Sequence, residues 1–74
     1  MNIERIKAMD LLIDKQRTGT PSQFAIKLRI SERTIYKYII YMKTTLKAPV
    51  AYSKTRQSYY YSEAGTLNII WKKP

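Results

Sequence analysis

The chain of 74 residues contains no cysteine and no histidine. A disulfide framework is therefore excluded, and without thiolate or imidazole ligands we expect no metal site. No apolar run approaches the roughly 20 residues that a membrane span requires. The first ten residues, MNIERIKAMD, carry acidic side chains where a secretory signal peptide has cations and then an apolar stretch. Together these absences predict a soluble, cytoplasmic protein that makes no membrane contact.

Acidic residues are also scarce, and the few present are scattered along the chain: Glu4, Asp10, Asp14, Glu32 and Glu63. General acid–base catalysis needs paired titratable groups, and phosphate chemistry commonly uses a glycine-rich loop. The chain offers neither, so we expect that it is not an enzyme and holds no cofactor.

The opposite sign of charge is abundant, with 14 lysines and arginines against 5 acidic residues, a net charge of +9. In one small domain this balance favours a polyanionic partner, nucleic acid above all. An inert basic surface, or docking on acidic membranes or ribosomes, remains the alternative. The hydrophobic fraction of 45% is typical of a globular chain.

Hydrophobic periodicity predicts three helices before residue 49. The first covers about residues 3–17, with Asn2 as N-cap and an end near Thr18 and Gly19. Thr20, Pro21 and Gln23 form a capping box that opens a short second helix over about residues 21–29. The apolar stripe of the first helix consists of Ile3, Ile6, Met9, Leu12 and Ile13.

The third helix is predicted over about residues 32–47, with Ser31 as its N-cap. Its inward stripe is Ile35, Ile39, Met42 and Leu46. The opposite side carries Arg33, Lys37 and Thr44, with Tyr36 and Ile40 beside them. One face of this helix therefore builds the core, while the other is basic and aromatic.

After Pro49 the segment VAYSKTRQSYYY predicts a hairpin over about residues 50–61, with a four-residue loop at 54–57. Pairing Ser53 with Ser58 places Tyr52, Tyr59 and Tyr61 on the face toward the core. We interpret residues 62–74 as part of the same domain, with Leu67 to Trp71 as a further strand or an extended arm. The predicted fold class is mainly α with a small β wing, an α+β arrangement.

This layout resembles a known family. The segment TPSQFAIKLRISERTIYKYIIYMK is similar to the helix-turn-helix of deoxyribose-repressor-type, biotin-repressor-type and WYL-domain bacterial regulators. The segment APVAYSKTRQSYYY resembles the wing of the WYL-type proteins. The resemblance covers about residues 3–61 and implies a winged helix-turn-helix. Family members usually carry small or acidic residues where Tyr38 and Tyr41 stand, and glycines near Gln57.

Those regulators continue into a ligand-sensing or catalytic domain, whereas the resemblance of this chain covers only their DNA-reading module. We therefore expect that this chain binds no small-molecule effector. The third helix would lie in the major groove, with Arg33 donating to guanine and Lys37 to guanine or phosphate. Thr34 and Tyr36 would contact phosphate or a thymine methyl. The remaining predicted DNA-binding residues are Ser31 at the helix start, Ser22 near a phosphate, and Lys54 and Arg56 in the hairpin loop.

Simpler interpretations exist for each of these groups. Arg33 and Lys37 could form a solvated face, and hairpin cations commonly discourage edge pairing. The tyrosines could stack on single-stranded bases, although three of them are predicted to face the core.

We expect sequence-specific binding of double-stranded DNA by a small, nucleoid-associated transcriptional regulator or an architectural factor of a phage or mobile element.

A rival hypothesis is a winged-helix protein-interaction adaptor that reads no DNA. The two hypotheses differ on the third helix, since an adaptor has no need of Arg33 and Lys37 together. We also expect a homodimer, which would match two half-sites one helical turn apart. Its predicted surface consists of Leu11, Ile40, Tyr41, Tyr60 and the segment from Leu67 to Trp71.

Overall fold

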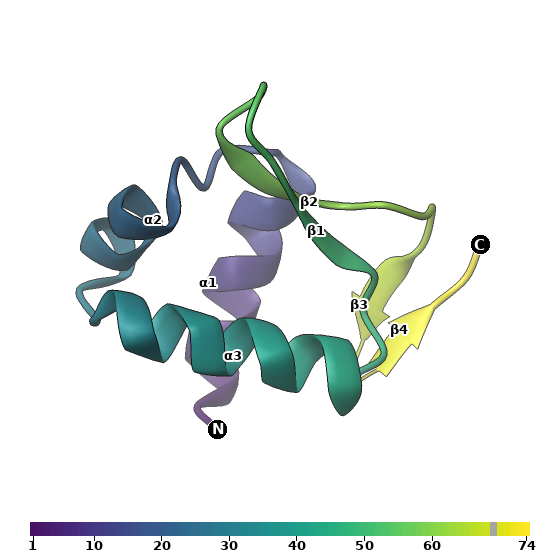
Figure 1. Cartoon of the computed structure of the whole chain (residues 1–74). Coiled ribbons are helices and arrows are strands. Elements are labelled where there is room, and N and C mark those ends of the chain that lie inside the picture. The colour runs from purple at the N-terminus through teal and green to yellow at the C-terminus, as the bar shows by residue number, and fades with distance from the viewer. Residues whose placement is uncertain (69) are drawn as a thin grey trace.

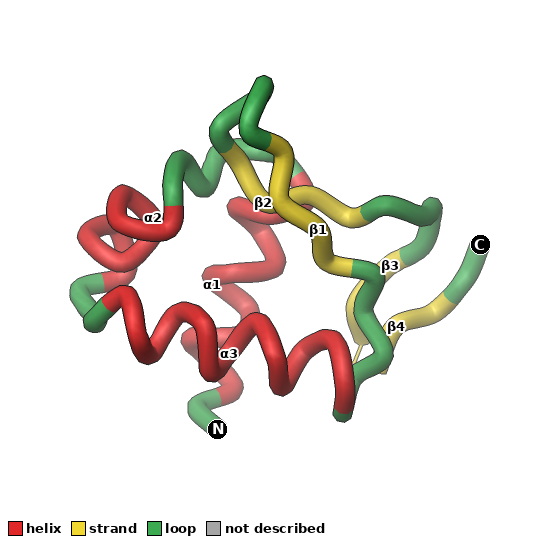
Figure 2. The backbone as a smooth tube through the Cα atoms, in the orientation of Figure 1, coloured by secondary structure: helices red, strands yellow, loops and turns green. Residues whose placement is uncertain are grey.

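Three helices are followed by two antiparallel hairpins in the computed structural model, which describes residues 1–68 and 70–74 (Figures 1 and 2). This α+β arrangement confirms the predicted fold class and is compatible with a winged helix. Among the described residues, no helix is both long enough and apolar enough to cross a bilayer. The elements are α1 Ile3–Asp14, α2 Pro21–Leu28, α3 Glu32–Thr44, β1 Val50–Ser53, β2 Ser58–Tyr61, β3 Thr66–Asn68 and β4 Ile70–Lys72.

All three helices begin at the predicted N-caps. The Asn2 side chain accepts a hydrogen bond from the backbone N–H of Arg5 at 3.1 Å. Thr20 and Gln23 exchange side-chain to backbone bonds of 3.2 and 2.8 Å, so both halves of the capping box are present. Polar side chains thus satisfy helix N–H groups that have no partner within the helix.

The helices end earlier than predicted, at residues 14, 28 and 44 in place of 17, 29 and 47. Three residues that are not glycine adopt left-handed backbone angles just past these ends: Gln16 with φ 55°, Arg29 with φ 57° and Lys47 with φ 60°. The expectation that Gly19 would cap the first helix is wrong, because Gln16 has already turned the chain. Left-handed residues commonly close helices, but glycine is the usual sequence signal for them.

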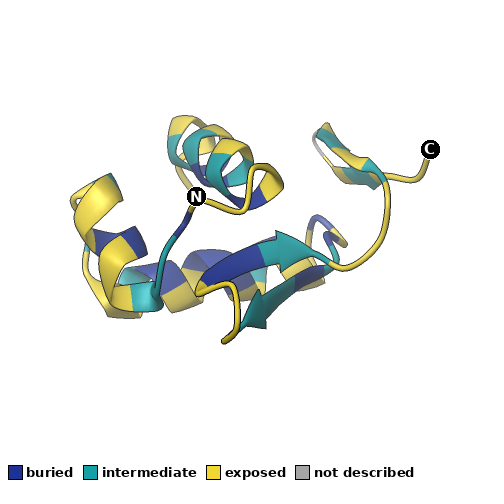
Figure 3. Cartoon of the chain, turned by 90° about the horizontal axis from the view of Figure 1, so that it is seen from above, coloured by how far each residue is buried: buried dark blue, intermediate teal, exposed yellow. Residues whose placement is uncertain are grey.

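The core lies where α1, α3 and the first hairpin meet, and Figure 3 shows buried faces turned toward one another across this interior. The predicted inward stripe of α3 is confirmed, since all four of its members are buried. On α1 the stripe is only partly correct: Ile3 is 57% exposed and Leu12 is half-buried. The buried apolar residues are Ile6, Met9, Ile13, Phe24, Ala25, Ile35, Tyr38, Ile39, Met42, Leu46, Ala48, Val50 and Tyr59.

The first hairpin has the predicted register. Val50 pairs with Tyr61 and Ser53 with Ser58, with the two intervening pairs between them. Tyr59 is buried, and its ring centroid lies 5.8 Å from that of Phe24 and 5.0 Å from that of Tyr52. The tyrosines on this face therefore pack as core groups, as predicted, which removes most of the basis for a single-strand stacking surface.

The C-terminal segment forms a second hairpin, whereas the sequence predicted a single strand or an arm. β3 pairs antiparallel with β4, with Leu67 opposite Trp71. The predicted segment includes residue 69, which lies outside the described residues. The backbone N–H of Trp71 donates to the backbone carbonyl of Leu46 at 2.7 Å, and the centroid of the Trp71 ring lies 4.4 Å from that of the Tyr61 ring. These contacts dock the hairpin onto the end of α3 and onto β2.

Candidate nucleic-acid interface

The solvent side of α3 carries cationic and aromatic side chains at helical spacing. Arg33, Tyr36, Lys37, Ile40 and Thr44 are all exposed, as predicted. Arg33 and Lys37 are one turn apart, so both side chains project from the same side of the helix. The burial of Ile35, Ile39 and Met42 on the other side fixes this orientation. We refer to the five exposed residues as the α3 face.

Two residues predicted to contact DNA, Ser31 and Thr34, already form hydrogen bonds with each other at the start of α3. The hydroxyl oxygen of Ser31 accepts the backbone N–H of Thr34 at 3.1 Å, and the two hydroxyl oxygens lie 2.9 Å apart. Thr34 is half-buried, while Ser31 is exposed. Of this pair, Ser31 is the one whose surface is open to a ligand.

Tyr36 has a partner that sequence reasoning missed. Its hydroxyl donates to the Glu32 carboxylate at 2.9 Å, and this bond raises the pKa of Tyr36 above its ordinary value. The spacing of four residues along the helix was the available signal. The bond lays the phenol group along the first turn of α3 and uses its donor.

The loop of the first hairpin presents Lys54 and Arg56, and both are exposed. The Arg56 guanidinium carbon lies 5.2 Å from the centre of the Tyr60 ring, within the range of a cation–π contact. The backbone N–H of Arg56 donates to Ser53 Oγ at 3.2 Å. Arg56 is therefore held back along the hairpin, whereas no such contact is recorded among the described residues for Lys54.

At the start of α2, Ser22 is exposed as well, one position past Pro21. Its neighbours Thr20 and Gln23 are occupied by the capping box described above. Ser22 thus offers a hydroxyl beside the helix N-terminus, in keeping with its predicted phosphate contact.

Positive charge is segregated along the chain. Residues 21–61 hold eight lysines and arginines against one acid, Glu32, so they carry +7 of the net +9. The helix α1 has two cations against three acids, a net charge of −1. Seen from above in Figure 3, α1 and the second hairpin lie along one edge, with α2, α3 and the first hairpin along the other. The elements that carry most of the positive charge therefore lie on one side of the molecule.

The α3 face and the first hairpin are close neighbours. Burial raises the pKa of Tyr59 in β2 to about 12, with smaller contributions from Tyr36, Tyr52 and Glu32 nearby. The helix α3 also packs directly against β1, so the two elements lie side by side.

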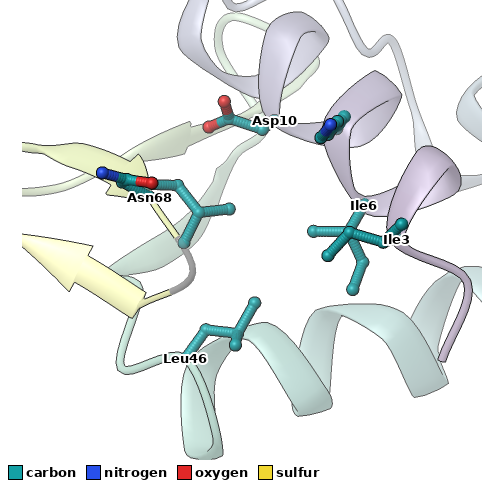
Figure 4. Close-up of a pocket in the computed structure, with 7 residues that line it drawn as sticks. Ile3, Ile6, Asp10, Leu46 and Asn68 are labelled. Atoms are coloured by element: carbon teal, nitrogen blue, oxygen red, sulfur yellow. The ribbon is translucent and has the colours of Figure 1, made fainter.

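A separate cavity lies on the other side, between α1, Leu46 and the second hairpin (Figure 4). Its volume is about 360 Å³, and its lining is mostly apolar: Ile3, Ile6, Leu46 and Leu67, with Lys7, Asp10 and Asn68. No sequence pattern predicts this cavity, because it depends on where the second hairpin docks. It does not adjoin the α3 face.

The predicted homodimer surface is only partly exposed. Leu11 and Ile40 are exposed, on α1 and α3 respectively. Tyr41, Leu67 and Trp71 are half-buried and pack against the chain's own core, so they offer a second copy less surface than predicted. Tyr60 lies beneath Arg56. The C-terminal segment thus packs within its own chain through these contacts.

Comparison of the chain with models of protein families, with curated proteins and with solved structures found no match.

Proposed function

We propose that this protein binds double-stranded DNA sequence-specifically, with α3 in the major groove. The loop of the first hairpin, acting as a wing, would lie on the adjacent backbone or in the minor groove. The observation that carries this proposal is the exposure of Arg33 and Lys37 on one uncovered side of a helix. An α-helix fits the B-DNA major groove, and its side chains reach base edges there.

The charge distribution supports the same geometry. Residues 21–61, which form α2, α3 and the first hairpin, carry +7 of the net +9. Lysines and arginines that neutralise phosphates release counterions, which provides most of the sequence-independent affinity. In this proposal Lys54, Arg56, Ser22 and Ser31 position the protein on the backbone. Arg33 and Lys37 read guanines.

The biological role that fits is a small transcriptional regulator or an architectural factor of a phage or mobile element. Either role places the protein on the nucleoid. In both cases α3 provides sequence readout, while the hairpin provides orientation.

Fluorescence anisotropy with a duplex selected from a random pool tests the proposal. We expect binding that weakens steeply with salt, and a loss of about 1–3 kcal/mol in Arg33→Ala. Lys37→Ala and Lys7→Ala remove the same charge from α3 and from α1, so only the first should weaken binding strongly. Undetectable or salt-insensitive binding at about 50 mM salt would favour the protein-interaction adaptor instead.

A further inference from the structure

The α3 face has an apolar centre that the core does not explain. Ile40 is 60% exposed and Tyr36 is 45% exposed, one turn apart on the same side of the helix. Ile40 belongs neither to the buried cluster nor to the half-buried residues packed against it. An exposed isoleucine alone is ordinary. Here it lies within a face that also carries Arg33 and Lys37, so the apolar and cationic groups would meet the same ligand.

The hydroxyl groups of Thr44 and Tyr36, on either side of Ile40, both donate hydrogen bonds within α3. The Thr44 hydroxyl donates to the Ile40 carbonyl at 2.8 Å. The Tyr36 hydroxyl donates to Glu32 at 2.9 Å. What remains at the surface between these bonds is the aliphatic side chain of Ile40 and the ring of Tyr36. Such a surface selects a partner with an apolar group of similar size.

The edges of the base pairs in the major groove offer one prominent apolar group, the C5-methyl of thymine. We propose that Ile40, flanked by the Tyr36 ring, contacts thymine methyl groups and so makes thymine a required base in the bound sequence. This inference rests on the proposed DNA binding. It assigns Ile40 to base recognition, whereas the sequence had placed it on a homodimer surface.

The charge of the α3 face argues against a second copy of the chain as its partner. α3 carries three cations, Arg33, Lys37 and Lys43, against the single acid Glu32. Two such faces brought together would place like charges opposite each other, which is unfavourable at an interface. A polyanion that also displays methyl groups satisfies both features of the face.

Replacing thymine with deoxyuridine removes only the C5-methyl, so it tests the contact directly. The probes are a duplex recovered by selection from a random pool and the same duplex with deoxyuridine at every thymine. We expect the wild-type protein to bind the thymine form about fourfold more tightly for each methyl contacted, the effect of burying one such group. In Ile40→Ala this preference should disappear, and alanine keeps the helix intact. Ile3→Ala, matched in residue type and exposure but located on α1, should retain it.

Equal affinity of the wild-type protein for the two duplexes would overturn the inference. If that equal binding were still strongly salt-dependent, the proposed DNA binding itself would stand. A selected consensus without thymine, or self-association that Ile40→Ala abolishes, would also overturn it. Absence of binding to any duplex would overturn both proposals together.

Discussion

Thr18 and Ser58, forty residues apart, are joined by buried hydrogen bonds that fix the first hairpin to the linker between α1 and α2. The backbone N–H of Thr18 donates to Ser58 Oγ at 3.2 Å, and the two hydroxyl oxygens lie 3.1 Å apart. The backbone N–H of Tyr59 donates to Thr18 Oγ1 at 2.9 Å. Both residues are buried. This cluster positions the proposed wing relative to the helices.

Thr18→Val is expected to destabilise the fold by about 1–3 kcal/mol, because it leaves the buried N–H of Tyr59 without an acceptor. Valine keeps the shape of threonine, so packing changes little. Urea denaturation measures the effect. The exposed loop residue Thr55 is the matched control, and Thr55→Val should change stability by less than about 0.5 kcal/mol. Equal losses in the two variants would show that the cluster contributes nothing.

Gln57→Gly should stabilise the protein by about 0.5–1 kcal/mol, because Gln57 has a φ of 51°, an angle that glycine adopts without steric cost. Thermal unfolding provides the measurement. Thr55, in the same loop, is not among the residues with positive φ. Thr55→Gly should therefore destabilise slightly, through the greater chain entropy of the unfolded state. A lower melting temperature in Gln57→Gly would contradict this prediction.

Gly65→Ala should displace the second hairpin. A β-carbon at this position would lie 2.7 Å from the Trp71 ring and would collide with the carbonyl oxygen of Lys72. We expect a loss of about 1–3 kcal/mol. Emission from Trp71, the sole tryptophan, should shift to longer wavelength as its ring is exposed. Ala64→Ser, at the exposed neighbouring position, should leave the emission unchanged. An unshifted spectrum in Gly65→Ala would mean that the ring is not docked there.

The Asp10 carboxyl predicts a pH dependence of stability. Burial raises the pKa of Asp10 above its usual 3.8, against the lowering effect of a hydrogen bond from the Tyr61 hydroxyl at 2.6 Å. The folded state therefore holds this proton more tightly than the unfolded state does. The resulting contribution to stability is complete below the unfolded pKa and is lost as pH rises through the raised value.

Asp10→Asn isolates that contribution. As pH rises from about 3 to about 6, the wild-type protein should lose stability relative to Asp10→Asn, which cannot ionise. Asparagine still offers an acceptor to Tyr61. Asp14, which also raises the pKa of Asp10, is present in both proteins. The measurement is urea unfolding at several pH values. A stability difference that stays constant with pH would contradict the raised pKa.

Lys54→Ala should weaken binding to all duplexes about equally and reduce the salt slope of the logarithm of affinity by about 0.9, the loss of one phosphate contact. An equal loss on all duplexes would mean that the proposed wing contacts only the DNA backbone. Anisotropy titrations with two unrelated duplexes measure this effect. Lys72→Ala, on the second hairpin, should leave both affinities nearly unchanged. A sequence-dependent loss in Lys54→Ala would show that the wing reads DNA shape instead.

Much of the fold and the location of the candidate site could be read from the sequence. The N-caps at Asn2, Thr20 and Ser31, and the inward stripe of α3, depend on neighbours within a few residues. The register of the first hairpin follows from its four-residue loop and its alternating side chains. Helix ends were less predictable, because Gln16, Arg29 and Lys47 adopt left-handed angles that sequence patterns associate with glycine.

By itself, the sequence determined the helices, the first hairpin and the side of α3 that carries Arg33 and Lys37. Each of these follows from local periodicity or from the sign of charge. Only the tertiary structure decided that Thr18 and Ser58 meet, that Trp71 docks on Leu46 and Tyr61, and that Tyr36 is tied to Glu32 beside an exposed Ile40. Contacts between distant segments depend on how complete surfaces fit together, and a single sequence carries no local pattern for them.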